Sequence, residues 1–223
     1  MKVKVCGITQ MDQLYALSEM DVAYAGFIFY PPSPRFVSRA GLQGADVKKS
    51  KVKLHKVGVF VDATYDEVMR RIDEFGLDIV QLHGRETPYE CRKIAANIDV
   101  IKAFRFAEND PVMWMIKDYY ETSDFFLFDT GVTVPKEDSE NKILYGGTGR
   151  KFDWNRLRSL HIQKPFLLSG GIEPNDAETI KAFMQDNVAG DMIAVDINSR
   201  FETVPGVKDM VKVKQFLTEL KME

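Results

Sequence analysis

Short apolar segments alternate with amphipathic segments along the whole chain. The apolar segments have the length of buried strands, and the segments between them repeat their apolar residues at helical spacing. Strands are predicted at Lys2–Cys6, Val22–Phe29, His55–Val61, Ile79–Leu82, Val100–Phe104, Phe125–Phe128, Phe166–Ser169 and Met192–Ile197. Helices are predicted at Met11–Met20, Tyr65–Phe75, Pro88–Asn97, Asp110–Tyr120, Trp154–Leu160, Asn175–Asp186 and Val207–Leu220.

Several helix starts carry recognisable capping residues. Thr64, Thr87 and Asn109 stand directly before helical segments, and Pro88 and Pro111 occupy the first turns after the last two, a position that proline favours. The helix expected within residues 39–51 is weakly marked, because glycines interrupt it.

Strands that alternate with helices favour a parallel sheet with helical crossovers. A closed (β/α)8 TIM barrel forming a single α/β domain over residues 1–223 fits the length and the strand count, and an open doubly wound sheet is the alternative. Polar residues follow the strand ends along the chain, and closure would gather them at one rim. They include Cys6, Arg35, Asp62, Gln81, His83, Arg105, Asp129, Ser169 and Asp196.

Composition excludes several classes of protein. The net charge of −3 gives no general attraction to nucleic acid or to an acidic membrane surface, and no apolar run reaches the length of a membrane span. Two cysteines, Cys6 and Cys91, cannot form a disulfide framework, and their spacing does not indicate a metal site. Lysines near the N-terminus interrupt any secretory leader, so a reducing cytoplasmic setting is expected.

Cys6 and Asp129 are the strand-end residues with the most reactive chemistry. Asp129 ends the apolar run 125–128, where loss of solvation favours the protonated form of a carboxyl group, as a general acid requires. It could equally cap a turn or pair with Arg105. Cys6 could act as a nucleophile or base if nearby positive charge stabilises its thiolate, and Lys4 shares its face of the strand. The other interpretation of Cys6 is packing, which is also the interpretation of Cys91 on its helix.

Two consecutive strand ends carry loops suited to an anion. Gly170-Gly171 follows the seventh strand and Asn198-Ser199 follows the eighth, where barrels often bind phosphate through backbone N–H groups. Tight turns are the alternative. Arg35 lies in a proline-rich loop that would hold its guanidinium ready for a carboxylate, unless it is an ordinary surface arginine.

A long polar loop over residues 131–142 follows Asp129 and leads to the glycine-rich segment 145–149. Long loops at a barrel rim often act as lids over an active site. His83 is interpreted as a hydrogen-bonding or positioning residue and not as the base.

Taken in order, these segments resemble phosphoribosylanthranilate isomerases. The motifs run the length of the chain: 4–9 (KVCGIT), 26–29 (GFIF), 33–38 (SPRFVS), 57–61 (VGVFV), 80–84 (VQLHG), 128–130 (FDT), 146–149 (GGTG), 169–172 (SGGI) and 195–199 (VDINS). Each is weak alone, but their order and spacing together are specific.

The resemblance implies a (β/α)8 barrel that performs an Amadori rearrangement in tryptophan biosynthesis, an aldose–ketose isomerisation of the intramolecular oxidoreductase type, without metal or cofactor. It implies that Asp129 is the general acid at the ribose ring oxygen and that Cys6 is the base at C2. Arg35 would hold the anthranilate carboxylate and Asp196 would contact the substrate. The Gly170-Gly171 and Asn198-Ser199 loops would hold the phosphate. The partner would be this small phosphosugar, and the protein would be a monomer or homodimer.

One departure concerns the last loop, where Arg200 stands in place of the glycine that many relatives have. Arginine adopts positive φ less readily than glycine, so either the turn differs or the arginine adds charge near the phosphate. Another phosphosugar barrel enzyme, such as a ribonucleotide isomerase or an indole-glycerol-phosphate synthase, is an alternative. So is a barrel that binds a phosphometabolite without turnover.

Overall fold

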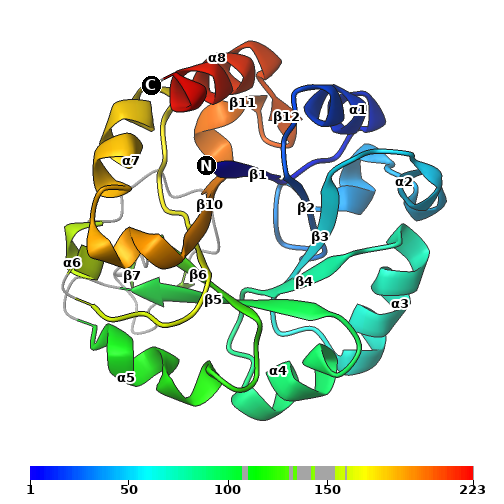
Figure 1. Ribbon diagram of the computed structural model, residues 1–223. Coiled ribbons are helices and arrows are strands. Elements are labelled where there is room, and N and C mark those ends of the chain that lie inside the picture. The colour runs from blue at the N-terminus through cyan, green and yellow to red at the C-terminus, as the bar shows by residue number, and fades with distance from the viewer. Residues whose placement is uncertain (107–109, 131–132, 135–141, 144–153, 159, 223) are drawn as a thin grey trace.

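Eight parallel strands close into a barrel in the computed structural model, which describes residues 1–106, 110–130, 133–134, 142–143, 154–158 and 160–222. The barrel strands are β1 (Lys2–Cys6), β2 (Tyr24–Ile28), β3 (His55–Phe60), β4 (Ile79–Leu82), β5 (Asp99–Phe106), β6 (Phe125–Thr130), β9 (Phe166–Leu168) and β10 (Met192–Ile197). The ring closes because β1 pairs with both β2 and β10 (Figure 1). The predicted closed barrel is therefore confirmed, and the open sheet is excluded.

Helices cover the outside of the ring (Figure 1). They are α1 (Met11–Glu19), α2 (Gly44–Lys49), α3 (Tyr65–Phe75), α4 (Pro88–Ala95), α5 (Val112–Ile116), α6 (Asn155–Arg158), α7 (Ala177–Phe183) and α8 (Met210–Lys221), with 3-10 turns at Val37–Ala40, Lys117–Tyr119, Pro174–Asp176, Asn187–Asp191 and Ser199–Phe201. Thr64 and Thr87 cap α3 and α4 as predicted, each accepting a hydrogen bond from a backbone N–H of the first turn. Asn109, the third predicted cap, lies outside the described residues.

The largest departure from the predicted elements lies before α8. The helix expected to begin at Val207 begins at Met210, because β11 (Glu202–Val204) and β12 (Val207–Lys208) form an antiparallel hairpin. Asp209 then caps the helix by accepting from two backbone N–H groups of its first turn. Other ends differ from the predicted ends by a few residues, as helix and strand ends commonly do.

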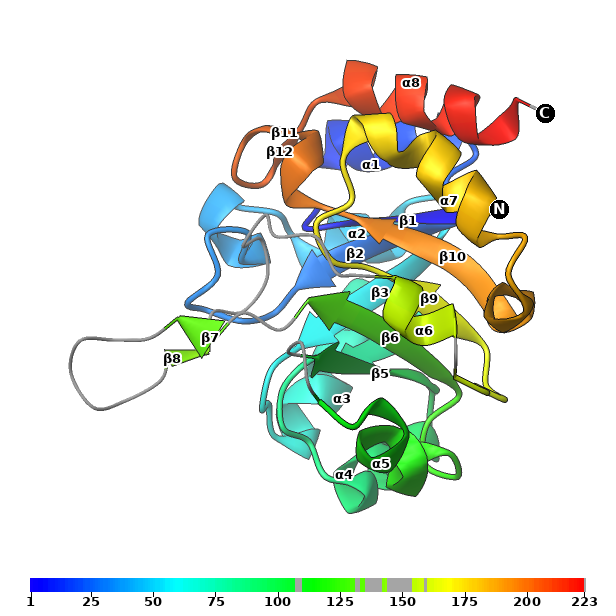
Figure 2. The same cartoon turned by 90° about the vertical axis from the view of Figure 1, so that its left-hand side faces the viewer.

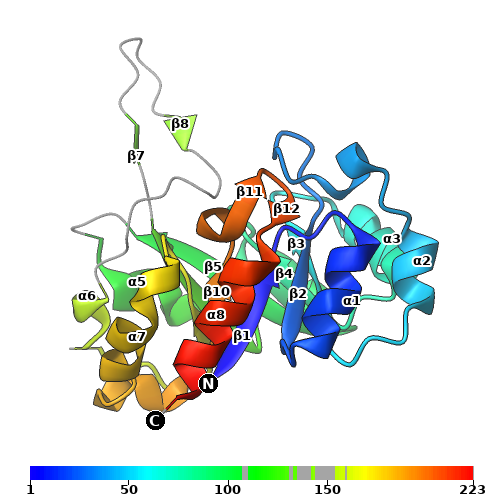
Figure 3. The same ribbon diagram turned by 90° about the horizontal axis from the view of Figure 1, so that it is seen from above.

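This hairpin lies at the end of the barrel toward which the strands point. Figures 2 and 3 show β11 and β12 at that end together with β7 (Thr133–Val134) and β8 (Lys142–Ile143), while both chain termini lie at the opposite end. Apart from the residues of β7 and β8, the predicted lid loop lies outside the described residues, and so does the segment 145–149. In barrels of this kind, the carboxyl-terminal end of the strands carries the active site.

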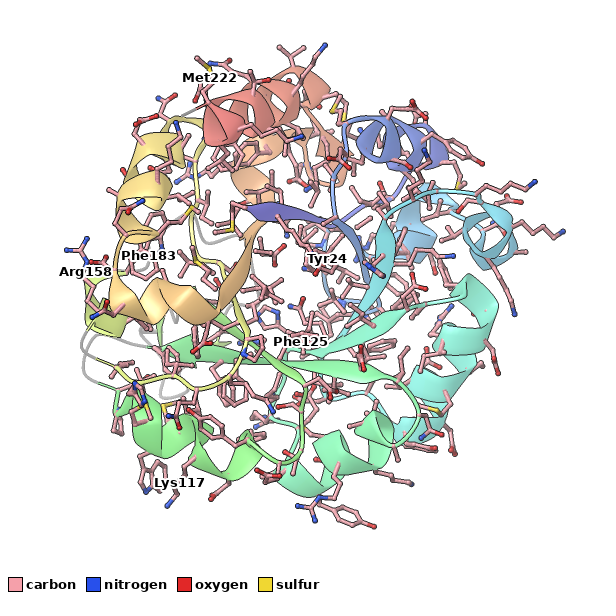
Figure 4. All side chains as sticks on the ribbon, viewed as in Figure 1. Tyr24, Lys117, Phe125, Arg158, Phe183 and Met222 are labelled. Atoms are coloured by element: carbon pink, nitrogen blue, oxygen red, sulfur yellow. The ribbon has the colours of Figure 1, made fainter. Side chains whose placement is uncertain are left out.

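Alternation along the strands separates two layers of core. Tyr24, Leu127 and Ala194 belong to a buried cluster inside the ring, whereas Phe27 and Phe126 pack in the larger cluster between the strands and the helices. Figure 4 shows the side chain of Tyr24 within the ring. Residues in phase with the inner set face the barrel axis, so polar residues in that phase near the strand ends line the rim.

Candidate active site

Lys4 and Asp196 form a buried ion pair where β1 meets β10. They are register partners across the two strands, and Nζ of Lys4 lies 2.9 Å from Oδ2 of Asp196. Oδ1 of Asp196 is buried and has no hydrogen-bond partner among the described residues. Cys6 follows Lys4 on the same face of β1, so a carboxylate, an ammonium group and a thiol share the rim here.

The charge state of Cys6 depends on this pair. Burial raises the pKa of the Cys6 thiol above its ordinary value, and the positive charges of Lys4 and Lys208 oppose that rise. Burial by itself lowers the pKa of Lys4, but Asp196 and Cys6 outweigh it, so this pKa lies above its ordinary value. Lys4 therefore keeps its charge. Its positive charge makes the pKa of the Cys6 thiol lower than burial alone would make it.

The packing around Cys6 differs from that around Cys91. A Cβ atom on Gly26, the register partner of Cys6 on β2, would lie only 2.9 Å from the Cys6 Sγ atom. Gly26 therefore leaves the space that the thiol occupies. Cys91 belongs instead to the main hydrophobic core, where burial raises its pKa to about 12. The packing interpretation of Cys91 is confirmed.

Asp129 lies on the other side of the barrel, near the end of β6, with Arg105 as its register partner on β5. Its Oδ2 atom is 3.3 Å from Nε2 of His83. The other ring nitrogen, Nδ1, lies 2.8 Å from Nε2 of Gln81. If the Gln81 amide donates, Nδ1 accepts, and the imidazole carries its proton on Nε2 toward Asp129. The residue predicted to position others thus lies against the predicted acid.

His83 is held neutral by its surroundings. Burial lowers its pKa, Asp129 opposes that effect, and the positive charges of Arg105 and Lys102 reinforce it. β10, which carries Asp196, lies between β1 with Cys6 and β9, whose other neighbour is β6 with Asp129. Burial raises the pKa of the Asp196 carboxyl group, and Lys4 opposes that rise.

Arg35 is buried and not a surface arginine, with 8% of its surface exposed. Its Nε and Nη2 atoms donate to the carboxylate of Glu202 at 2.7 to 3.0 Å. Nζ of Lys208 donates to the same carboxylate at 2.7 Å and to Oδ1 of Asn198 at 2.8 Å. A Cβ atom on Gly7 would lie 2.8 Å from Cδ of Arg35, so the backbone after Cys6 supports the arginine chain.

The two predicted anion loops lie next to one another at the ends of β9 and β10, which are neighbours in the barrel. Gly170 and Gly171 both have positive φ, at 96° and 70°, which glycine adopts without strain. Asn198 precedes the 3-10 turn that begins at Ser199. Arg200 lies in this turn and is not among the described residues with positive φ; its Nε lies 3.4 Å from Oε1 of Glu173. The turn thus accommodates the arginine, which pairs with the neighbouring loop.

Two residues whose side chains are almost covered at the rim were missed by sequence reasoning: Glu202, with 4% of its side chain exposed, and Lys208, with 0%. Both lie in the segment that was assigned to a loop and a helix start. The signal that could have found them is Pro205-Gly206, which favours a tight turn and would bring the residues on its two sides together.

Across the described residues, no helix is long and apolar enough to cross a membrane.

The closed barrel and the ionisable groups at the carboxyl ends of its strands define the class of this protein, that of (β/α)8-barrel enzymes. Comparison with known proteins identifies the family. The family model described as N-(5'-phosphoribosyl)anthranilate (PRA) isomerase matches residues 3–219. The chain belongs to this family.

Individual relatives agree with the family match. The N-(5'-phosphoribosyl)anthranilate isomerase of Phocaeicola vulgatus is 36% identical over 100% of this chain and 99% of its own length. The crystal structure of phosphoribosyl anthranilate isomerase from Thermotoga maritima superposes with a TM-score of 0.78 at 32% identity, covering 99% of this chain and 98% of that one. A further isomerase structure, in complex with reduced 1-(o-carboxyphenylamino)-1-deoxyribulose 5-phosphate, has a TM-score of 0.75 at 29% identity with the same coverage.

Proposed function

We propose that this protein converts N-(5-phosphoribosyl)anthranilate into 1-(2-carboxyphenylamino)-1-deoxyribulose 5-phosphate in tryptophan biosynthesis. Membership of the isomerase family supports the reaction. The observation that carries the residue assignment is the position of the Cys6 thiol at the rim, under the influence of the buried cations Lys4 and Lys208. Lys4 and Lys208 are paired with Asp196 and Glu202, and their charges also oppose the increase that burial causes in the pKa of the thiol.

In the proposed first step, Asp129 protonates the ribose ring oxygen. The bond from C1 to that oxygen breaks, and the nitrogen lone pair forms the C=N bond of a protonated Schiff base. Asp129 is suited to this role because Nε2 of His83 lies 3.3 Å from its Oδ2 atom and makes no hydrogen bond among the described residues. With its proton on Nε2, the ring would become a donor to the carboxylate left after proton transfer.

In the second step, the Cys6 thiolate removes the proton from C2. The electron pair of that C–H bond forms the C1=C2 double bond, and the Schiff base nitrogen becomes neutral. The resulting enolamine tautomerises: the C2 hydroxyl loses its proton as the C2=O bond forms, and the electron pair of the C1=C2 bond takes up a proton at C1. The substrate gains and loses the same number of protons, and return of the proton from Cys6 to Asp129 through solvent restores the enzyme, as general acid–base catalysis permits without a cofactor.

The remaining residues bind the ends of the substrate. Arg35 is proposed to bind the anthranilate carboxylate, for which the planar guanidinium is well suited. The loops with Gly170-Gly171 and Asn198-Ser199 are proposed to hold the phosphate through backbone N–H groups. Asp196 is proposed to accept a hydrogen bond from a ribose hydroxyl, which the unsatisfied, buried Oδ1 atom supports.

The test is the loss of substrate fluorescence on turnover, followed for the parent protein and for Cys6→Ser and Asp129→Asn. Each variant should lose at least about 100-fold in kcat, the usual contribution of a positioned acid or base. Inactive parent protein would contradict the isomerase function. An active parent with near-parental turnover in both variants would contradict the acid–base assignment alone.

A further inference from the structure

We propose that Glu202 is a positioning residue that holds the guanidinium of Arg35 in the orientation that binds the substrate carboxylate. The inference rests on the proposed function, in which Arg35 binds the anthranilate carboxylate. It assigns a role to a buried acid that the reaction steps themselves do not use.

Glu202 occupies one edge of the guanidinium. Its Oε1 accepts from Nε of Arg35 at 2.9 Å, and its Oε2 accepts from Nε at 3.0 Å and from Nη2 at 2.7 Å. A guanidinium has five N–H donors in one plane, so this contact leaves the Nη1 side of the group for a second carboxylate. Because the fork is planar and rigid, fixing one edge also fixes the direction of the other.

Glu202 is itself anchored on its far side by Lys208. Nζ of Lys208 donates to Oε1 of Glu202 at 2.7 Å and to Oδ1 of Asn198 at 2.8 Å. The backbone N–H of Lys208 donates to Oε1 of Gln13, and the Gln13 amide donates back to the Lys208 carbonyl, each at 3.2 Å. A chain of partly buried contacts therefore runs from Arg35 to Asn198 in the proposed phosphate loop.

The charges along this chain support an ionised Glu202. Burial acts to raise the pKa of Glu202, but its hydrogen bonds and attraction to Arg35 and Lys208 outweigh that effect and bring this pKa below its ordinary value. An ionised acceptor gives the stronger, charge-assisted hydrogen bond to the guanidinium.

A competing role for Glu202 would be to occupy Arg35 only until substrate arrives. In that case Arg35 would have to leave Glu202, and a buried carboxylate would lose one of its cations, which is costly. Binding through the Nη1 side requires no such exchange. The two roles predict opposite effects when Glu202 is changed.

The test measures how strongly the protein prefers a ligand with a carboxylate. The probes are the reduced product analogue, a secondary amine carrying the aromatic carboxylate, and the same compound without that carboxylate. Binding of both is measured by isothermal titration calorimetry, and the ratio of the two Kd values is the carboxylate discrimination. Glu202→Gln is expected to reduce this ratio about tenfold, as for one weakened charge-assisted contact, with the carboxylate-free compound bound as before.

Two further variants separate positioning from damage to the fold. Glu202→Gln removes the anion that Lys208 contacts and leaves the lysine charge uncompensated. A double variant, Glu202→Gln with Lys208→Gln, removes that charge as well, and a similar loss of carboxylate discrimination is expected. In an Arg35→Met background, Glu202→Gln should change the ratio no further, because the group it positions is absent. Glu173→Gln, which removes another carboxylate paired with an arginine at the rim, is the matched control and should leave the ratio unchanged.

Each outcome has a separate meaning. If Arg35→Met leaves the ratio unchanged, the proposed role of Arg35 fails and the inference fails with it. If Arg35→Met removes the discrimination but Glu202→Gln does not change it, only the inference is overturned. Tighter binding of the carboxylated analogue by Glu202→Gln would also overturn it, because Glu202 would then be a competitor.

Discussion

Lys4 of β1 and Asp196 of β10 face each other across the strand pair that closes the barrel, with Nζ and Oδ2 2.9 Å apart and both side chains almost fully buried. The pair therefore belongs both to the closure of the fold and to the rim that carries Cys6. These two roles can be separated by experiment, because one concerns the free energy of unfolding and the other the ionisation of a thiol.

For stability, Lys4→Met is expected to lower the free energy of unfolding by about 3 kcal/mol, because it leaves the Asp196 carboxylate buried without its cation. Adding Asp196→Asn should recover most of this loss, since a neutral pair removes the uncompensated charge. Urea unfolding at neutral pH measures both. Equal stability of the single and double variants would show that the buried charge is not the cause.

For ionisation, Lys4→Met is expected to shift the rising limb of the pH profile of kcat/KM to higher pH. Lys4 opposes the increase that burial causes in the pKa of Cys6, so its removal raises that pKa further and leaves less thiolate at neutral pH. Lys2→Met is the matched control, because Lys2 is exposed on the same strand two residues earlier. A limb that stays in place in folded Lys4→Met protein would contradict the assignment of Cys6 as the base or of Lys4 as its partner.

The two cysteines should respond differently to a thiol reagent. Iodoacetamide is expected to inactivate both the parent protein and Cys91→Ala, with one alkylated thiol in each, identified by mass spectrometry as Cys6. Burial raises the pKa of both thiols, but Cys91 has no exposed surface within the core and its pKa is raised to about 12, whereas Cys6 lies at the rim, where Lys4 and Lys208 oppose the rise in its pKa. Cys91→Ala should retain activity while losing about 1 to 2 kcal/mol of stability through the small cavity it creates. Inactivation that follows modification of Cys91 would contradict this assignment.

Much of the rim was predictable because it depends on local pattern. The apolar run before Asp129 and the alternation before Cys6 both place a strand end, and closure of the barrel then brings strand ends together. Thr64 and Thr87 were correctly predicted as caps because a cap is decided within one turn of helix. The contact of Arg35 with Glu202 joins residues 167 positions apart in the sequence, and no local pattern specifies such a pair. The contact of His83 with Asp129 likewise joins two strands that only the closed barrel brings together, whereas its contact with Gln81 is local to one strand.

Changing His83 should affect both kcat and the pH dependence of stability, for two separate reasons. His83→Gln is expected to lower kcat about tenfold with little change in KM, because the donor that faces Asp129 acts on the carboxylate formed during proton transfer. It should also change the pH dependence of stability. Burial lowers the pKa of His83 in the folded protein, so the unfolded chain takes up this proton first as the pH falls below about 6.5.

The stability contribution of neutral His83 is thus fully present above that pH and is lost as the pH falls through the lower, folded pKa. Thermal unfolding of the parent protein between about pH 7 and pH 5 should show this loss, and His83→Gln should show less of it because glutamine does not titrate. His161→Gln is the control, since that histidine is exposed. If His83→Gln keeps the parental dependence, the buried ring is not the group that titrates. If it keeps the parental kcat as well, the contact with Asp129 has no part in the proton transfer.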